Sequence, residues 1–242
     1  MNKALFDESG YKKQIILFGI FFLVLIAIVI YLFASKSNEY IIVRESCILE
    51  KKGSKYVQLN KVNDDILKNT FNVYSDSGLD KNISIKYQDN SWYYFDSDYS
   101  DLGLKKVSVA YTGDKDKIKA SDYDVSYYSE DDKKFLDDYS EEDYNSVIKS
   151  SYDLDGDGVN ETIYTINGQN KASIFAVRND KVIGYLDSSK SPYYVQNILD
   201  LDGNGKYEVI VSKGTTDYAT FDTCFQIYSI NGSKIKKIKD CK

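Results

Sequence analysis

An acidic nine-residue loop that occurs twice constrains this chain more than any other feature. The first copy, DLDGDGVNE, covers residues 153–161, and the second, DLDGNGKYE, covers residues 200–208 of the 242-residue chain. A strand-forming run follows each copy, TIYT after the first and VIVS after the second, and residues 174–182 resemble residues 227–235. Self-similarity at this spacing is typical of repeated structural units, so we expect two units, each with an acidic loop, a strand and a β-hairpin.

The residue types in the loop favour calcium. A Ca²⁺ ion takes six to eight oxygen ligands, and alternate side chains of a tightly curled loop converge on one point. The glycines between the acidic positions allow this curl. The expected ligands are Asp153, Asp155, Asp157, the Val159 carbonyl and Glu161 in the first loop, and Asp200, Asp202, Asn204, the Lys206 carbonyl and Glu208 in the second. The sequence therefore predicts two Ca²⁺ sites, and an ordinary Asx-rich turn is the competing interpretation.

The flanking residues separate these loops from EF-hands, which need an acid at position 12 and a helix on each side. Position 12 is Tyr164 or Val211 here, and strand formers follow both loops. The pattern resembles the calcium loop of FG-GAP or VCBS repeats, which form the β-propeller blades of integrin α chains and of many bacterial surface proteins. This resemblance covers residues 153–242 and implies that the matching loop residues bind calcium and that each loop joins strands of a four-stranded blade. Because two units are too few to close a propeller, we expect them to pack on each other or on the preceding segment.

The second constraint is an uncharged apolar run from Ile15 to Phe33. At 1.5 Å per residue it spans roughly 29 Å, so it predicts a transmembrane helix over residues 14–34. A cleaved signal peptide is the alternative, but its apolar region is shorter and ends in a small-x-small site. Lys12 and Lys13 beside the run predict that residues 1–13 are a cytoplasmic tail and that the remainder is extracellular. The chain is thus predicted to be a single-pass protein of the cell membrane.

The rest of the chain divides by composition. Residues 35–125 contain short alternating runs separated by Asp, Asn, Gly and Ser, which predicts a small β domain. Residues 126–152 are rich in acids and are expected to form an acidic linker with a short helix, capped at Ser140 and ending near Lys149. Residues 153–242 hold the two calcium-loop repeats. The predicted fold class is a mainly β ectodomain behind one N-terminal transmembrane helix.

Two further clusters in the first of these segments have competing interpretations. Asp96, Asp98 and Asp101 resemble a cation site but lack glycines, so a solvated turn is favoured. The aromatic run 92–94 has the composition of a sugar-stacking platform, but cross-strand packing is the favoured interpretation. Neither cluster is therefore assigned a site.

Three cysteines are available for a disulfide, which is permitted outside the cytoplasm. The repeat hairpins are expected to turn at Asn179-Asp180 and at Asn231-Gly232, since these residue types adopt positive φ readily. Cys224 and Cys241 flank the second turn on paired strands. The sequence therefore favours a Cys224–Cys241 disulfide, with Cys47 left as a thiol.

Composition excludes several function classes. The chain has no histidine, so a histidine base and a histidine-ligated zinc site are excluded. A net charge of −6 and a basic set of 29 Lys and 2 Arg disfavour nucleic acid as a partner. The lysine-rich usage indicates a bacterial source.

The function predicted is a membrane-anchored, extracytoplasmic calcium-binding β module of a bacterial cell surface. It is expected to be non-catalytic, with an envelope glycan or a protein as partner. The alternatives are an envelope glycan-acting hydrolase with a carboxylate pair, or a structural or regulatory partner of another membrane protein.

Overall fold

In the computed structural model the chain forms two compact units, Met1–Asn38 and Glu39–Lys242. The structure describes residues 16–28, 39–44, 47–53, 55–75, 78–95, 104–106, 109–112, 119, 121, 123–136, 144–169, 171–214 and 224–241.

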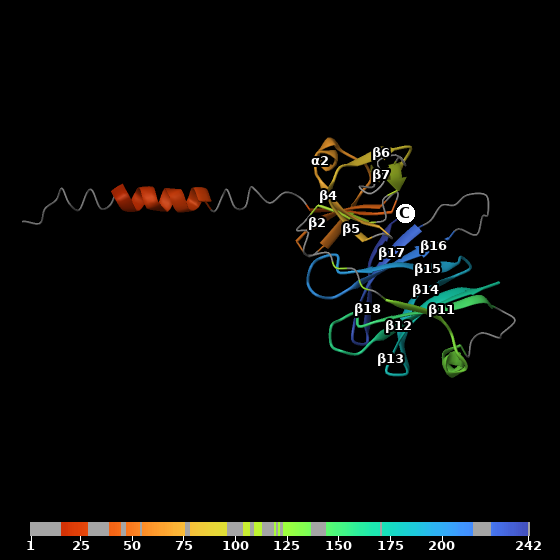
Figure 1. The fold of residues 1–242 in the computed structure, drawn as a ribbon. Helices are drawn as coiled ribbons and strands as arrows, with labels where there is room; N and C mark the ends of the chain where they lie inside the picture. The colour runs from red at the N-terminus through yellow and green to blue at the C-terminus, as the bar shows by residue number, and fades with distance from the viewer. Residues whose placement is uncertain are drawn as a thin grey trace, which may run out of the picture. The chain divides into compact units, whose positions relative to one another are not determined.

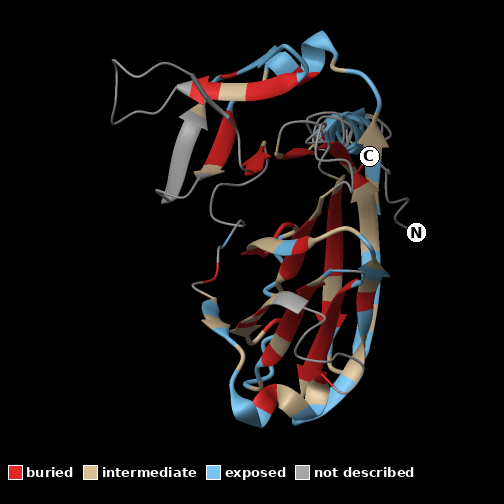
Figure 2. Ribbon diagram, turned by 90° about the vertical axis from the view of Figure 1, so that its right-hand side faces the viewer, coloured by how far each residue is buried: buried red, intermediate tan, exposed pale blue. Residues whose placement is uncertain are grey.

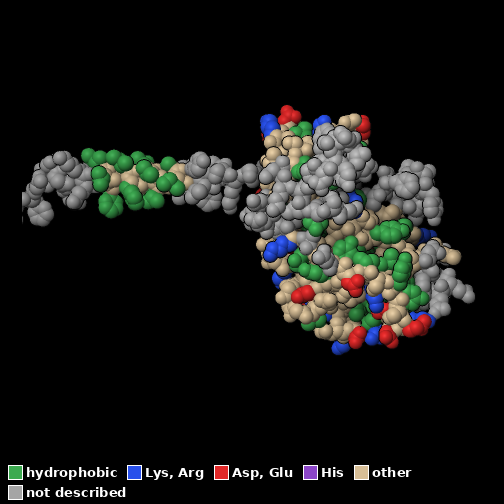
Figure 3. Space-filling view, viewed as in Figure 1, with side chains coloured by type: hydrophobic (Ala, Val, Ile, Leu, Met, Phe, Trp, Pro, Cys, Tyr) green, Lys and Arg blue, Asp and Glu red, His purple; other side chains and the backbone are tan. Residues whose placement is uncertain are grey.

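The first unit contributes one helix to the described residues, 16–28 (Figure 1). Its hydrophobic side chains are exposed along its length (Figure 3), including Phe21. The predicted transmembrane helix over 14–34 is wrong: in the part of the chain that the structure describes, no helix combines the length and the apolar character that a membrane crossing requires. The described helix spans about 20 Å at 1.5 Å per residue, against about 30 Å for a hydrocarbon core. The predicted cytoplasmic tail, 1–13, lies outside the described residues.

In the second unit the described residues form eighteen strands in four sheets, which confirms the mainly β part of the predicted fold class. The first ten strands are β1 Glu39–Val43, β2 Cys47–Lys52, β3 Lys55–Leu59, β4 Phe71–Ser75, β5 Gly78–Ile83, β6 Ile85–Gln88, β7 Ser91–Phe95, β8 Leu104–Lys106, β9 Val109–Tyr111 and β10 Asp124–Tyr127. The remaining strands are β11 Tyr144–Tyr152, β12 Glu161–Gly168, β13 Ala172–Arg178, β14 Lys181–Ser189, β15 Tyr193–Leu199, β16 Glu208–Lys213, β17 Cys224–Asn231 and β18 Lys234–Cys241. Two short helical turns accompany them, α2 Asp64–Leu67 and the 3₁₀ helix η1 Glu130–Phe135.

Every paired strand is antiparallel to its neighbour. The sheets have six strands (β3-β2-β1-β9-β4-β5), five strands (β10-β11-β12-β13-β14), four strands (β15-β16-β17-β18) and three strands (β6-β7-β8). The four-stranded sheet shares one core with the five-stranded sheet and another with the six-stranded sheet, so it lies between them. Buried residues are red on the ribbon in Figure 2.

The apolar pattern of β16 explains this central position. Successive side chains of a strand point to opposite faces, so a strand buried on both faces reads as a continuous apolar run. Val209 packs in the core shared with the five-stranded sheet, beside Ile174, whereas Ile210 packs in the core shared with the six-stranded sheet, beside Leu49. The two repeats therefore pack on each other, and the second also packs on the preceding segment.

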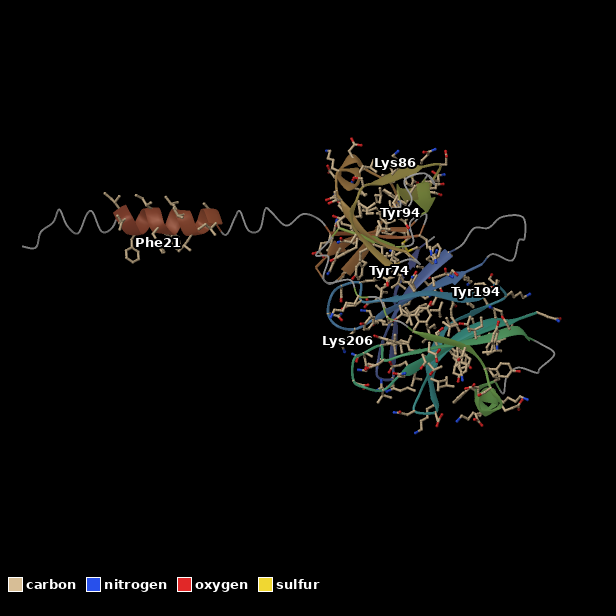
Figure 4. The ribbon with its side chains drawn as sticks, viewed as in Figure 1. Phe21, Tyr74, Lys86, Tyr94, Tyr194 and Lys206 are labelled. Atoms are coloured by element: carbon tan, nitrogen blue, oxygen red, sulfur yellow. A yellow bond between two sulfur atoms is a disulfide. The ribbon has the colours of Figure 1, made fainter. Side chains whose placement is uncertain are left out.

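The outer faces of the stack are covered in different ways. Ile42 of the six-stranded sheet packs with Trp92 and Tyr94 of the three-stranded sheet, and both aromatic side chains are buried. This burial fits the interpretation that the aromatic run 92–94 packs across strands. Tyr94 is labelled in Figure 4. On the far face of the five-stranded sheet, Leu136 after η1 packs on Phe175. The acidic cluster Asp96, Asp98 and Asp101 lies outside the described residues.

The two repeats have the same strand order, β11 to β14 and β15 to β18, and the acidic loops join the first strand to the second in each. The first hairpin turns at Asn179-Asp180 as predicted, with φ of 48° and 57°. In the second hairpin Asn231 pairs with Lys234, so the turn is Gly232-Ser233, one residue later than expected. The predicted order of loop, strand and hairpin is confirmed.

The short helix predicted to end near Lys149 is wrong. Tyr144–Tyr152 instead form β11, which pairs with β12 along its whole length, and Ser140 lies outside the described residues. The helical turn of this segment is η1, where the Asp132 carboxylate accepts hydrogen bonds from the backbone N–H (2.6 Å) and the hydroxyl (2.7 Å) of Ser129. Pairing with a distant strand outweighs the local preference of a cap-like sequence.

The predicted Cys224–Cys241 disulfide is also wrong, because Cys241 is bonded to Cys47. A bulge between Ile227 and Tyr228 shifts the register of β17 and β18 by one residue, so Cys241 lies opposite Phe225 rather than Cys224. A one-residue shift moves a side chain to the other face of a sheet. Cys241 therefore faces the six-stranded sheet, where Cys47 begins β2.

Candidate metal centre

The acidic loops lie at equivalent places, between β11 and β12 and between β15 and β16; Lys206, labelled in Figure 4, marks the second. Four glycines shape them. Gly156 and Gly158 have φ of 76° and 87°, and Gly203 and Gly205 have φ of 72° and 84°. Residues with a Cβ rarely adopt this left-handed conformation, so the glycine spacing dictates the curl of both loops.

The first aspartate of each loop organises the backbone. The Asp153 carboxylate accepts hydrogen bonds from the backbone N–H groups of Gly156 (2.8 Å), Asp157 (3.1 Å) and Gly158 (2.8 Å). Asp200 accepts the three corresponding bonds at 2.7, 3.1 and 2.8 Å. The two loops thus share one hydrogen-bond pattern, as their sequences indicate.

The closing glutamates are buried under the loops. Glu161 is fully buried and Glu208 nearly so, and each accepts a 2.9 Å hydrogen bond from the backbone N–H of the second loop residue, Leu154 or Leu201. Both leucine side chains are buried in the cores on either side of the four-stranded sheet. Hydrophobic packing therefore positions the loop, and the loop positions the glutamate.

Three carboxylates meet in each loop, with one oxygen of each within 4.8 Å of the others. They are Asp153, Asp155 and Glu161 in the first loop, and Asp200, Asp202 and Glu208 in the second. Such clusters of oxygen donors fit a hard divalent cation. Asp157 is not among the three acids of the first cluster. The Asp157 and Asn204 side chains, which are the remaining predicted side-chain ligands, accept the backbone N–H of Val159 (3.0 Å) and Lys206 (2.7 Å). Cation binding by the Val159 and Lys206 carbonyls stays a prediction.

The two loops lie side by side. The backbone N–H of Tyr207 donates to the carbonyl of Leu154 (2.8 Å), and the rings of Tyr152 and Tyr207 meet edge to face, with centroids 4.9 Å apart. The Gly232 N–H, from the hairpin of the second repeat, donates to Asp155 (2.5 Å). The second repeat therefore contacts the first at the acidic loops as well as in the core.

The carboxylates of the second loop lie near the six-stranded sheet, which changes the pKa values of neighbouring groups. Burial raises the pKa of Glu208 to about 8, and the neighbouring Asp202 and Asp200 carboxylates add to this shift. Burial and the same three carboxylates also raise the pKa of Tyr56 on β3 well above its ordinary value. The Tyr56 hydroxyl is buried and has no hydrogen-bond partner among the described residues. A cation bound here would offset the cost of burying this charge.

The first loop contains a residue that sequence reasoning missed. The Arg178 guanidinium forms ion pairs with Asp157 and Glu161, and its Nη1 lies 3.5 Å from Asp155. Burial raises the pKa of Glu161, and the charge of Arg178 opposes this shift. The available signal was the rarity of arginine, since Arg178 is one of two in a chain with 29 lysines.

A polar cavity of about 470 Å³ beside η1 is the other candidate site. Two ion pairs line it, Lys149–Asp132 (2.8 Å) and Lys134–Asp180 (3.0 Å), and the Tyr164 hydroxyl donates to Asp132. Burial alone would raise the pKa of Asp132, but the hydrogen bonds from Lys149, Tyr164 and Ser129 hold it well below its ordinary value. These charges are satisfied by one another, which indicates a structural role.

Comparisons with protein-family models, curated proteins and solved structures find no match for this chain. The likeness to FG-GAP or VCBS repeats therefore rests on the loop residues and stays a prediction.

Proposed function

We propose that this chain is a calcium-stabilised β protein that acts outside the cytoplasm as a non-catalytic binding or interaction module, with loops of the FG-GAP or VCBS type. The observation that carries the proposal is the pair of carboxylate clusters, each held by the same backbone hydrogen bonds and closed by a buried glutamate. Three carboxylates held this close repel one another unless a cation screens them, and among the described residues no lysine or arginine forms an ion pair with the carboxylates of the second loop.

The donor set favours calcium among the common metals. All donors are oxygens, and the chain has no histidine. Zinc, copper and nickel prefer nitrogen or sulfur ligands, whereas calcium and magnesium prefer oxygen. Magnesium demands a tight octahedron and keeps much of its water, so a loop that offers several carboxylates within a few ångströms suits calcium better.

The Cys47–Cys241 disulfide supports a location outside the cytoplasm. Disulfides persist in oxidising compartments and are rare where thiols are kept reduced. Extracellular calcium modules bind at about 0.1–1 mM, so calcium in such a compartment would act as a structural component of the fold. The partner would then be recognised by the surface of the calcium-loaded sheets, and an envelope glycan or another protein is the class that we propose.

Thermal melting of the full chain tests this proposal. At a calcium concentration 100-fold above Kd, one site adds about 2.7 kcal/mol to the free energy of unfolding. We expect the melting temperature to rise by several degrees with calcium over chelator, and by less with magnesium. The double variant Asp155→Ala plus Asp202→Ala should lose this response, whereas Asp124→Ala, an exposed acid on β10, should keep it. Identical melting of the unaltered chain in calcium and in chelator would contradict the proposal.

A further inference from the structure

We propose that the two loops are not equivalent: Arg178 is the resident cation of the first loop, and calcium binds only to the second. This inference rests on the proposed function and specifies which loop carries it. It starts from the ion pairs of the guanidinium with Asp157 and Glu161 and its 3.5 Å approach to Asp155.

The guanidinium contacts one oxygen each of Asp155, Asp157 and Glu161, whereas the other Asp155 oxygen, Oδ1, is buried without a hydrogen-bond partner among the described residues. The side chains of Asp155 and Glu161 are 5% and 0% exposed, and the Arg178 side chain is 12% exposed, so the contact is largely removed from water. An arginine is always charged and presents five N–H donors in a fixed fork. A calcium ion that used the Asp155 and Glu161 oxygens facing Arg178 would have to displace a cation that is covalently part of the chain.

Strand register brings this arginine to the loop. Thr162 at the start of β12 pairs with Val177 on β13, so Glu161 and Arg178 are the next residues on the two strands. Arg178 is also the last residue before the Asn179-Asp180 turn, which fixes the end of its strand. The backbone therefore holds the guanidinium beside the closing glutamate of the first loop.

Within the described part of the chain, the second loop has no such cation. Glu208 pairs across the sheet with Ser229, a short neutral residue. Of the nearby lysines, Lys206 donates to the Asn231 side chain (3.2 Å), and Lys51 reaches only the backbone carbonyl of Asp202 (3.4 Å). Among the described residues no lysine or arginine forms an ion pair with the three carboxylates of this loop.

The orphaned hydroxyl beside the second loop is a separate observation. Tyr56 on β3 packs against the core that contains Leu201 of the second loop, and its buried hydroxyl oxygen has no hydrogen-bond partner among the described residues. Buried polar groups are normally satisfied, so a missing partner marks a place for a bound species or its water. Calcium would thus act where the second repeat meets the six-stranded sheet.

Calorimetric titration of the full chain with Ca²⁺ counts the sites. We expect one site in the unaltered chain and two in Arg178→Gln, which removes the charge and keeps most of the side-chain volume. Arg44→Gln is the matched control: Arg44 bonds Gln196 (2.5 Å), away from both loops, and this variant should bind one ion. Single alanine variants then assign the site, since Asp202→Ala should bind none and Asp155→Ala should still bind one.

The outcomes separate this inference from the proposed function. Two sites in the unaltered chain, or a single site that Asp155→Ala removes and Asp202→Ala keeps, would overturn the inference and leave calcium binding intact. No uptake by either the unaltered chain or Arg178→Gln would overturn the proposed function itself. The inference is supported if Arg178→Gln binds one more ion than the unaltered chain and Arg44→Gln does not.

Discussion

The carbonyl of Leu154 in the first acidic loop accepts a 2.8 Å hydrogen bond from the backbone N–H of Tyr207 in the second. This bond links the two loops directly, and the bond from the Gly232 N–H to Asp155 links the hairpin of the second repeat to the first loop. The first loop is neutralised in part by Arg178, whereas the second is not. A cation in the second loop would therefore stabilise the contact between the two repeats at the acidic loops.

Asp155→Ala should lower stability whether or not calcium is present. It removes the acceptor of the Gly232 N–H and one partner of Arg178, so we expect the free energy of unfolding to fall by about 1–3 kcal/mol in calcium and in chelator alike. Urea denaturation under both conditions measures this. Asp124→Ala should change stability by less than about 0.5 kcal/mol. A loss seen only in calcium would show that the first loop binds the ion.

Metal-free protein should become less stable as pH rises from about 4.5 to 8. Because the pKa of Glu208 is raised to about 8 in the folded state, the folded chain holds a proton that the unfolded chain has released over this range. Proton release then favours unfolding as pH increases. Denaturation in chelator at several pH values measures the slope, and Glu208→Gln should flatten it while the exposed Glu130→Gln should not. An unchanged slope in Glu208→Gln would contradict this assignment.

Local sequence was sufficient for the loops and their strands. The alternation of Asp and Gly sets both the curl and the carboxylate positions, and these are properties of nine consecutive residues. The run 209–212 is predicted as a strand and forms one, and its burial on both faces is a feature that the structure adds. Where a few neighbouring residues decide the conformation, the prediction agrees with the structure.

Features that depend on distant pairing could not be predicted in the same way. Tyr144–Tyr152 follow a helix-cap-like sequence but pair with β12. The position of Arg178 beside Glu161 requires the register of β12 and β13, and the partner of Cys241 depends on one bulge. The transmembrane prediction is wrong because, within the described residues, no helix has the length and apolar character of a membrane span.

Acid should remove the stabilisation that the Asp132 carboxylate and its hydrogen-bond partners beside η1 give to the fold. The pKa of Asp132 is held below its ordinary value, so the cluster stabilises the fold above about pH 4, and this stability is lost as pH falls and Asp132 takes up a proton. Asp132→Asn should lower the free energy of unfolding by about 1–3 kcal/mol at neutral pH and by less near pH 3. Denaturation at the two pH values tests this. An equal loss at both would show that charge has no part in the effect.

The disulfide should join Cys47 to Cys241. A bond between residues separated by 194 positions closes a long loop and should contribute about 5 kcal/mol through the unfolded state. Peptide mapping of the oxidised chain without reduction should find this pair, and Cys224→Ser should leave it unchanged. A Cys224–Cys241 peptide would contradict the register of the last hairpin.

A crystal structure of the full chain grown with calcium tests the central claim most directly, because anomalous scattering locates the ion. The account predicts one ion in the second loop, with oxygens of Asp200, Asp202 and Glu208 at about 2.3–2.6 Å, and the Arg178 guanidinium still among the carboxylates of the first loop. An ion in the first loop with Arg178 displaced, or no ion in the second loop, would contradict it.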